Sequence, residues 1–223
     1  MSLEEKNSKV PLIVTIATAV VAVAAVVLLL IFKGADKEPD DSGSSAPSEI
    51  VFSATSELYT ECETEAAKLV GANYEVIRLF VTEGLPLRKV YGSTDELIDG
   101  YYVIDSDKYT EFSQIEALVK SIYTNTAAEK IFKGADGIQI YEDHNVHGDV
   151  FFGMNAAFSL DRYYDTDWSN CYIVVEPKSA DTCELTVYVN GVTEETASDI
   201  PGSVLKIGMV KTSEGWRLDE FLK

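Results

Sequence analysis

The chain has 223 residues and a formal net charge of −19 at pH 7, and 30 of its 37 acidic residues but 14 of its 18 basic residues lie after Glu49. This length leaves room for one ordinary domain and favours it over a multidomain architecture. The negative field repels nucleic acid and favours basic partners or cations, although it can also serve only to keep a domain soluble. Three cysteines are too few for a disulfide-built scaffold, so an apolar core must stabilise the fold.

Residues 10–32 form an uncharged apolar run that follows a short tail at residues 1–9. As a helix, a run of about 23 residues is roughly 34 Å long, which is enough to cross a hydrocarbon layer of about 30 Å. A cleavable signal peptide has a shorter apolar core that ends at small residues, whereas this run ends with Leu28–Phe32 directly before Lys33. The pattern therefore predicts an uncleaved transmembrane anchor.

Lysines flank the anchor equally, with Lys6 and Lys9 before it and Lys33 and Lys37 after it. The free amino terminus adds positive charge to the short tail, and long domains translocate largely regardless of flanking charge. We therefore expect a single-pass protein of the cell membrane, with a cytoplasmic tail and an extracytoplasmic domain.

Residues 33–49 are rich in Asp, Lys, Glu, Pro, Gly and Ser, a composition typical of a flexible, solvated linker. The domain then spans residues 50–223. Apolar residues at helical spacing predict its first helix over residues 55–82, before the stop signal Gly84-Leu85-Pro86. A short strand is predicted at Tyr101–Ile104.

Two further helices are indicated by capping boxes, in which two side chains satisfy free backbone donors. Ser113 with Glu116 opens one of them, and Thr126 with Glu129 opens the other, which ends at Lys133-Gly134. The residues expected to be buried on these two helices are Ile115, Leu118, Val119, Ile122, Ile131 and Phe132.

After Gly137 the apolar period changes to that of strands, which are separated by turn signals such as Asn190-Gly191 and Pro201-Gly202. The predicted strands are residues 138–141, 150–152, 171–175, 184–189, 204–212 and 216–221. Helices first and strands after predict an α+β domain, with the helices packed on one face of a curved antiparallel sheet.

Three short motifs resemble those of a known family: Ala66-Ala67-Lys68-Leu69-Val70, Gly100-Tyr101-Tyr102-Val103 and the closing Gly215-Trp216-Arg217-Leu218. On these motifs, residues 55–223 resemble the peptidoglycan DL-endopeptidase inhibitor (IseA-like) family, within the cone-shaped, NTF2-like domains of Firmicutes envelope proteins. The resemblance implies a proteinaceous inhibitor of cell-wall hydrolases, whose acidic surface and projecting loop block a hydrolase cleft.

An acidic and aromatic run supplies the candidate partner-binding residues: Asp161, Tyr163, Tyr164, Asp165, Asp167 and Trp168. Loops of this composition anchor a protein partner or stack on a sugar. The alternative is an aromatic cluster partly buried at a sheet edge, with only its polar tips in water.

The two histidines, His144 and His147, lie with Asp143 between two predicted strands. Neutral imidazoles and carboxylates are ligands for Zn²⁺ or a similar ion, so these three residues are a candidate metal site. The predicted hairpin loop provides no helix to set their geometry, and a solvated polar turn is the alternative.

The sequence contains no Gly-x-Ser-x-Gly motif, no glycine-rich phosphate loop and no cysteine with an evident base. We therefore expect a protein that has no enzymatic activity and no cofactor. Cys171 and Cys183 lie on successive predicted strands and could face each other across a hairpin, leaving Cys62 in a helix. Free cysteines that pack as small apolar residues are the alternative.

Two functions are favoured at this point, ahead of a small-molecule enzyme on the same fold. One is a membrane-anchored extracytoplasmic protein that binds, and inhibits or regulates, a peptidoglycan hydrolase. The other is an NTF2-like ligand-binding sensor or accessory domain of the cell envelope. A cavity with converging polar groups favours the second, and a filled core with a protruding acidic loop favours the first. The oligomeric state is not indicated.

Overall fold

A computed structural model describes residues 52–161, 163–197 and 200–223. The predicted tail at residues 1–9, the anchor at 10–32 and the linker at 33–49 lie outside the described residues. Val51–Lys223 forms one compact unit. None of the helices in the described part of the chain combines the length and the apolar character that a membrane crossing requires.

The longest helix, α2 (Ser56–Ile77), continues into a π-helical turn, η2 (Arg78–Thr82). The Thr55 hydroxyl caps its start by accepting from the Leu58 amide, and Gly84 follows its end at a φ of +69° that glycine adopts without strain. The buried hydroxyl of Tyr141 donates to the Leu79 carbonyl at 2.7 Å within the π-helical turn. The predicted helix over 55–82 is confirmed.

Two shorter helices follow, α3 (Phe112–Ile122) and α4 (Asn125–Lys133). Neither begins with the predicted capping box. The α3 start is satisfied from another element, because the Phe112 amide donates to Asp143 Oδ1 at 3.0 Å. The cap of α4 is Thr124, two residues before the predicted Thr126, and its hydroxyl accepts from the Ala127 amide.

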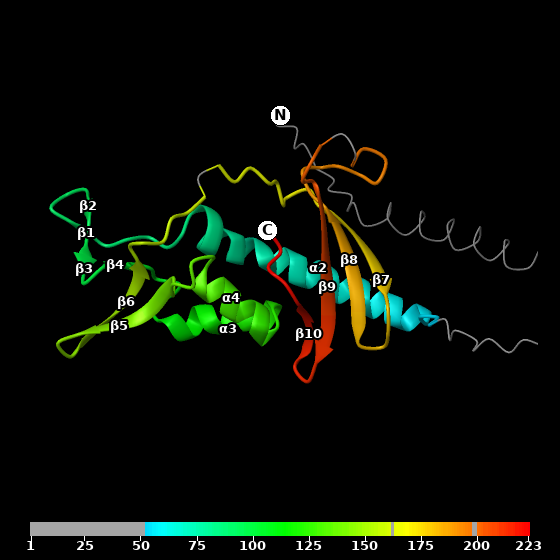
Figure 1. Cartoon of the computed structure of the whole chain (residues 1–223), viewed down its shortest axis with the longest axis horizontal. Coiled ribbons are helices and arrows are strands. Elements are labelled where there is room, and N and C mark those ends of the chain that lie inside the picture. The colour runs from blue at the N-terminus through cyan, green and yellow to red at the C-terminus, as the bar shows by residue number, and fades with distance from the viewer. Residues whose placement is uncertain (1–51, 162, 198–199) are drawn as a thin grey trace, which may run out of the picture. The chain divides into compact units, whose positions relative to one another are not determined.

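Four strands at the C-terminal end form one antiparallel sheet, in the order β10-β9-β8-β7. Their bounds are β7 (Tyr172–Pro177), β8 (Thr182–Tyr188), β9 (Val204–Thr212) and β10 (Gly215–Leu218). On β8, buried and half-buried residues alternate, and the inward row is Cys183, Leu185 and Val187. The N-terminal half of α2 lies alongside this sheet, and its C-terminal half lies beside α3 and α4 (Figure 1).

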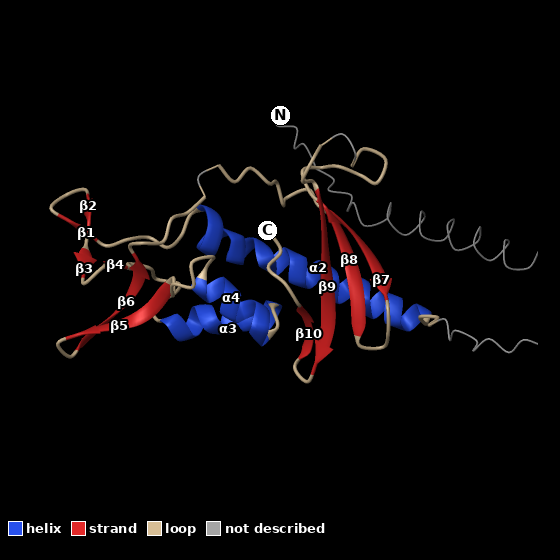
Figure 2. Ribbon diagram, in the orientation of Figure 1, coloured by secondary structure: helices blue, strands red, loops and turns tan. Residues whose placement is uncertain are grey.

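A second antiparallel sheet has the order β3-β4-β6-β5. Its bounds are β3 (Leu97–Ile98), β4 (Tyr101–Val103), β5 (Tyr141–Val146) and β6 (Asp149–Asn155). A small hairpin, β1 (Lys89–Val90) with β2 (Thr94–Asp95), projects beyond this sheet (Figure 2). The sequence predicted an α+β domain, and the structure confirms it. In the structure the strands belong to separate sheets and not to the single curved sheet that was predicted. The strand pattern in the sequence did not indicate this division.

The core is continuous from α2 through α3 and α4 to both sheets. Of the residues expected to be buried on α3 and α4, all are at most 6% exposed except Leu118, which is half-buried. The α3 stripe contacts β10, and Tyr123, directly after α3, forms a bridge with Leu218. A buried polar contact joins α2 to the end of α3 and to the segment after β10. Asn73 accepts from the Tyr123 hydroxyl and donates to the Leu222 carbonyl at 2.7 Å.

Candidate functional site

The predicted partner-binding residues fall in the connection between β6 and β7, here called the acidic segment (residues 161–168, without the undescribed residue 162). Its first residue is fixed to the π-helical turn, since the Asp161 amide donates to the Val81 carbonyl at 2.7 Å. The Asp161 carboxylate accepts from the Tyr163 amide at 2.9 Å, which closes a local turn. The segment is therefore attached to the helical layer at its start.

The far end of the acidic segment is attached to the turn after β8. The Asp167 amide donates to Asn190 Oδ1 at 2.6 Å, and the Asn190 amide donates back to the Asp167 carbonyl at 3.0 Å. Gly191 lies so close to Asn170 that an added Cβ would be 2.8 Å from its Nδ2 atom, and its φ is +69°. A residue with a side chain would disturb this attachment.

The Asp167 side chain is used within the segment. It accepts from the Ser169 amide at 2.9 Å and from the Ser169 hydroxyl at 2.6 Å. These hydrogen bonds lower the pKa of the Asp167 carboxyl below its usual value. The carboxylate itself remains exposed, so its charge is available to a partner.

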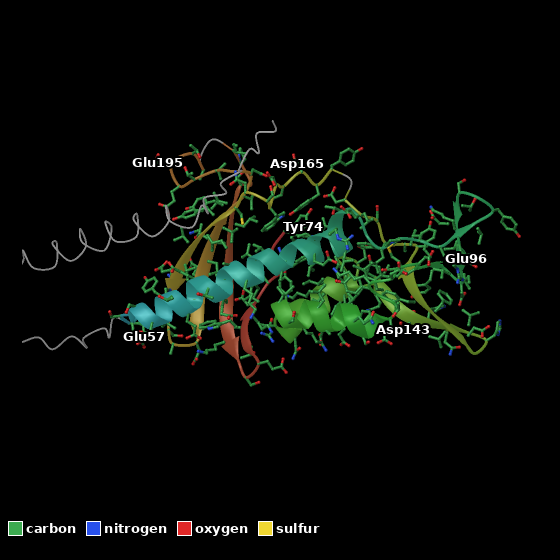
Figure 3. The ribbon with its side chains drawn as sticks, turned by 180° about the vertical axis from the view of Figure 1, so that it is seen from behind. Glu57, Tyr74, Glu96, Asp143, Asp165 and Glu195 are labelled. Atoms are coloured by element: carbon green, nitrogen blue, oxygen red, sulfur yellow. The ribbon has the colours of Figure 1, made fainter. Side chains whose placement is uncertain are left out.

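The aromatic residues of the segment divide into a support and an exposed tip. Trp168 is only 7% exposed, and its indole N–H donates to the Tyr164 hydroxyl at 2.7 Å. Tyr164 is half-buried, whereas Tyr163 is 93% exposed. Asp161, Asp165 and Asp167 are also exposed in this segment, and Asp165 marks the position of the segment in Figure 3. The predicted roles of these six residues in binding remain predictions.

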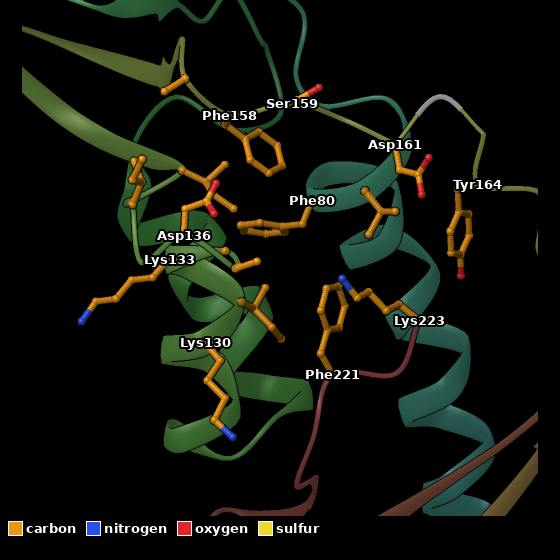
Figure 4. A pocket seen from close by; sticks show the side chains of 17 residues that line it. Phe80, Lys130, Lys133, Asp136, Phe158, Ser159, Asp161, Tyr164, Phe221 and Lys223 are labelled. Carbon is orange, nitrogen blue, oxygen red and sulfur yellow. The ribbon is translucent and has the colours of Figure 1, made fainter.

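A pocket of about 790 Å³ adjoins the acidic segment, and sequence reasoning did not identify it. Its wall combines residues from η2, from α4 and the segment that follows it, from the connection after β6 and from the segment after β10. The aromatic side chains of Phe80, Phe158 and Phe221 surround it, and Asp161 and Tyr164 border it (Figure 4). No signal in the sequence joins these distant segments.

The charged residues of the pocket are arranged unevenly. Lys223 lies beside Phe221, with its ammonium nitrogen 5.5 Å from the ring centre. Lys130 and Lys133 carry their ammonium groups away from the three phenylalanine rings (Figure 4). The wall is thus mainly apolar, with Lys223 held over one of its rings and the other two lysines directed outward.

The predicted metal residues do not converge on one point. His144 lies on β5 rather than in a loop, which corrects the prediction, and His147 occupies the hairpin turn with a φ of +55°. Neighbouring residues on a strand point to opposite faces, and Asp143 is used by the Phe112 amide. The described residues contain no group of three or more His, Cys, Asp or Glu side chains placed to hold a metal ion.

His144 instead contacts two carboxylates and an aromatic ring. Its Nδ1 atom lies 2.9 Å from Glu142 Oε1, and its Nε2 atom lies 3.3 Å from Asp99 Oδ2. The imidazole stacks on Tyr101 with ring centres 4.2 Å apart. Glu142 is the main cause that raises the pKa of His144, and Asp99 adds to it. The cluster therefore favours a protonated imidazole.

The cysteines offer poor nucleophiles in the folded domain. Cys62 and Cys183 are buried and Cys171 is half-buried, and burial raises the pKa of all three thiols. A thiol with a raised pKa carries little thiolate at neutral pH.

Comparison of the chain with models of known protein families, and with curated proteins, gives no match in either case.

Proposed function

We propose that the chain is a membrane-anchored extracytoplasmic protein whose acidic segment binds a peptidoglycan hydrolase and inhibits or regulates it. The observation that carries this proposal is Tyr163, which is 93% exposed and shares with three exposed carboxylates a segment that is fixed at both ends. The resemblance to the DL-endopeptidase inhibitor family supports the choice of partner. We also propose an NTF2-like arrangement of the domain, supported by the packing of α2 and α3 against the β7–β10 sheet.

Tyrosine is well suited to anchor a protein partner. Its ring supplies a large contact area with few rotatable bonds, and such aromatic residues account for much of the binding energy in many interfaces. A segment that is already held in place loses little further conformational entropy on binding. The support from Trp168 and from the Asn190 turn therefore favours binding without rearrangement.

The exposed carboxylates of the acidic segment contribute mainly to the rate of association. Exposed charges steer a basic partner toward the segment, and salt screens them over about 8 Å at physiological ionic strength. We expect the association rate constant to fall as ionic strength rises, while the dissociation rate constant changes little.

A titration of the fragment 50–223 against DL-endopeptidase-type and amidase-type hydrolases of the source organism tests the proposal. Tyr163→Ala should weaken binding about 5-fold to 30-fold, the loss expected for one interface anchor. Tyr74→Ala removes a side chain that is 55% exposed on α2 and serves as the matched control. Equal effects of the two substitutions, or no slowing of peptidoglycan cleavage by the fragment, would contradict the proposal.

The charge argument has its own matched pair of variants. Neutralising Asp161, Asp165 and Asp167 together should slow association, because the local field is lost. Neutralising Glu57, Glu63 and Asp107, which are also exposed, changes the net charge equally at other places. A similar slowing by both triple variants would show that only the total charge matters.

The pocket supports a second candidate function, a ligand-binding sensor or accessory domain. Its volume of about 790 Å³ lies within the range of small-molecule sites, and its interior is mainly apolar. The inner side chains of β8 are buried rather than arranged around a cavity, which supports protein binding as the first choice. Saturable binding of a small apolar ligand, without binding to any hydrolase, would reverse that order.

A further inference from the structure

Two of the three cysteines meet in the core of the domain. The Cys183 thiol lies against Cys62, with the two Sγ atoms 2.6 Å apart. Cys62 has no exposed surface and Cys183 is 3% exposed. They are 121 positions apart in the chain, so the contact is a product of the tertiary fold and not of local geometry.

Each thiol occupies a position that its element fixes. Cys62 lies on the buried stripe of α2, one turn before Ala66, where residues four apart lie on one face of a helix. Cys183 belongs to the inward row of β8, which is paired with β7 on one side and β9 on the other. Because α2 packs on this sheet, the two side chains point toward each other.

The pairing differs from the hairpin bridge considered for Cys171 and Cys183. In the register of β7 and β8, the residue opposite Cys183 is Pro177, and Cys171 lies before the first paired residue, Tyr172. Cys171 is half-buried and packs at the edge of the core. Cys171 therefore provides an internal control, because it carries the same thiol group but does not lie against another cysteine in the register of β7 and β8.

We propose that Cys62 and Cys183 form a disulfide bond in the mature protein, and that this bond fastens α2 to the central part of the β7–β10 sheet. The proposal rests on the extracytoplasmic location included in the proposed function, because disulfides persist in oxidising compartments. The contact, the burial of both sulfurs and their positions on two rigid elements support it.

The oxidant is a disulfide, carried by a thiol–disulfide exchange protein or by a small molecule. The thiolate of one cysteine attacks a sulfur of the oxidant, forms a mixed disulfide and releases one thiol. The thiolate of the second cysteine then attacks the mixed disulfide, which forms the Cys62–Cys183 bond and releases the second thiol. Two protons and two electrons leave the protein, and the oxidant is reduced from one disulfide to two thiols.

Burial determines when this exchange takes place. An attacking cysteine must be a thiolate that the oxidant can reach, and neither condition holds once α2 has packed on the sheet. The bond therefore forms while the chain folds, before the helix has docked. Once formed, it is shielded from reductants by the same burial.

Peptide mapping of the full-length protein, taken from membranes of the source organism and alkylated before digestion without reductant, tests the proposal. We expect one linked peptide pair that contains Cys62 and Cys183, and an alkylated Cys171. Alkylation of both Cys62 and Cys183, or a link that involves Cys171, would overturn the proposal.

Thermal unfolding of the fragment 50–223 gives a second readout. Closing a loop of this length restricts the unfolded chain, and we expect Tm to fall by about 10–20 °C when the bond is reduced or when both cysteines are replaced by alanine. Cys171→Ala should keep the sensitivity of Tm to reductant. Because burial shields the bond, the fragment is reduced while it is unfolded in urea and is then refolded in reductant. An identical Tm of this refolded fragment and of the native, oxidised fragment would contradict the proposal.

The outcome can be separated from that of the proposed function. Labelling a cysteine introduced into the linker with an impermeant reagent on intact cells, in a variant without the native cysteines, reports the location. The hydrolase titration reports the partner. A linked cysteine pair without hydrolase binding would support the disulfide and remove the inhibitor proposal. Hydrolase binding with unlinked Cys62 and Cys183 would support the inhibitor proposal and remove the disulfide.

Discussion

Replacing Asn73 with alanine tests the buried polar contact that connects α2 with α3 and the segment after β10. Asn73 is fully buried, and its amide serves the Tyr123 hydroxyl and the Leu222 carbonyl. The substitution leaves both groups without their partner, at about 1–3 kcal/mol each, so the free energy of unfolding should fall by about 2–6 kcal/mol. Tyr123→Phe leaves only the Asn73 oxygen unpaired and should cost about 1–3 kcal/mol.

Urea denaturation of the fragment 50–223, followed by circular dichroism, measures these losses. The double variant of Asn73 and Tyr123 should lose less than the two single variants together, because both remove the same hydrogen bond. Asn125→Ala, at an exposed position at the start of α4, should change the stability by less than about 0.5 kcal/mol. A loss below about 1 kcal/mol for Asn73→Ala, or simple additivity of the two changes, would refute the reasoning.

Two further predictions concern the helix α3 and the acid limb of the stability curve. Ile122 is 1% exposed, so Ile122→Ala should lower the free energy of unfolding by about 2–5 kcal/mol. Leu118 is half-buried, so Leu118→Ala should lower it by less. The reverse order in urea denaturation would mean that the buried face is wrongly assigned. Hydrogen bonds from Arg78 lower the pKa of Glu75 from 4.5 to about 2, so its contribution is full above about pH 4.5 and is lost as the pH falls toward about 2. Glu75→Gln should flatten the stability curve in this window, Glu57→Gln should not, and equal slopes for both variants would contradict the assignment.

The sequence predicted elements well where one periodic pattern decides them. The strand at residues 204–212 has the same bounds in the structure, as β9, and the long helix is confirmed. The caps were wrong because their choice depends on tertiary contacts. Thr126 has a glutamate three residues further on and Thr124 does not. The bridge between Tyr123 and Leu218, which no local pattern indicates, nevertheless lies directly before Thr124, where α4 begins.

The candidate sites show the same division between local and distant information. The acidic segment is recognisable from its composition, but only the fold distinguishes exposed Tyr163 from buried Trp168. His144 was expected in a loop because the run around it is polar, and the structure extends β5 through that run. The contact of Cys62 with Cys183 and the pocket walls involve segments far apart in the chain, for which spacing in the sequence carries no signal.

The hydrogen bond between Trp168 and Tyr164 gives the domain an intrinsic fluorescent reporter. The chain contains two tryptophans, and the other, Trp216, donates to Glu61 Oε1 at 2.8 Å beneath Lys211. Replacing Trp216 with phenylalanine leaves a single tryptophan, whose indole N–H is bonded inside the acidic segment. Its emission wavelength and quenching then report any change of that segment in real time, without attachment of a dye to the surface that a partner would contact.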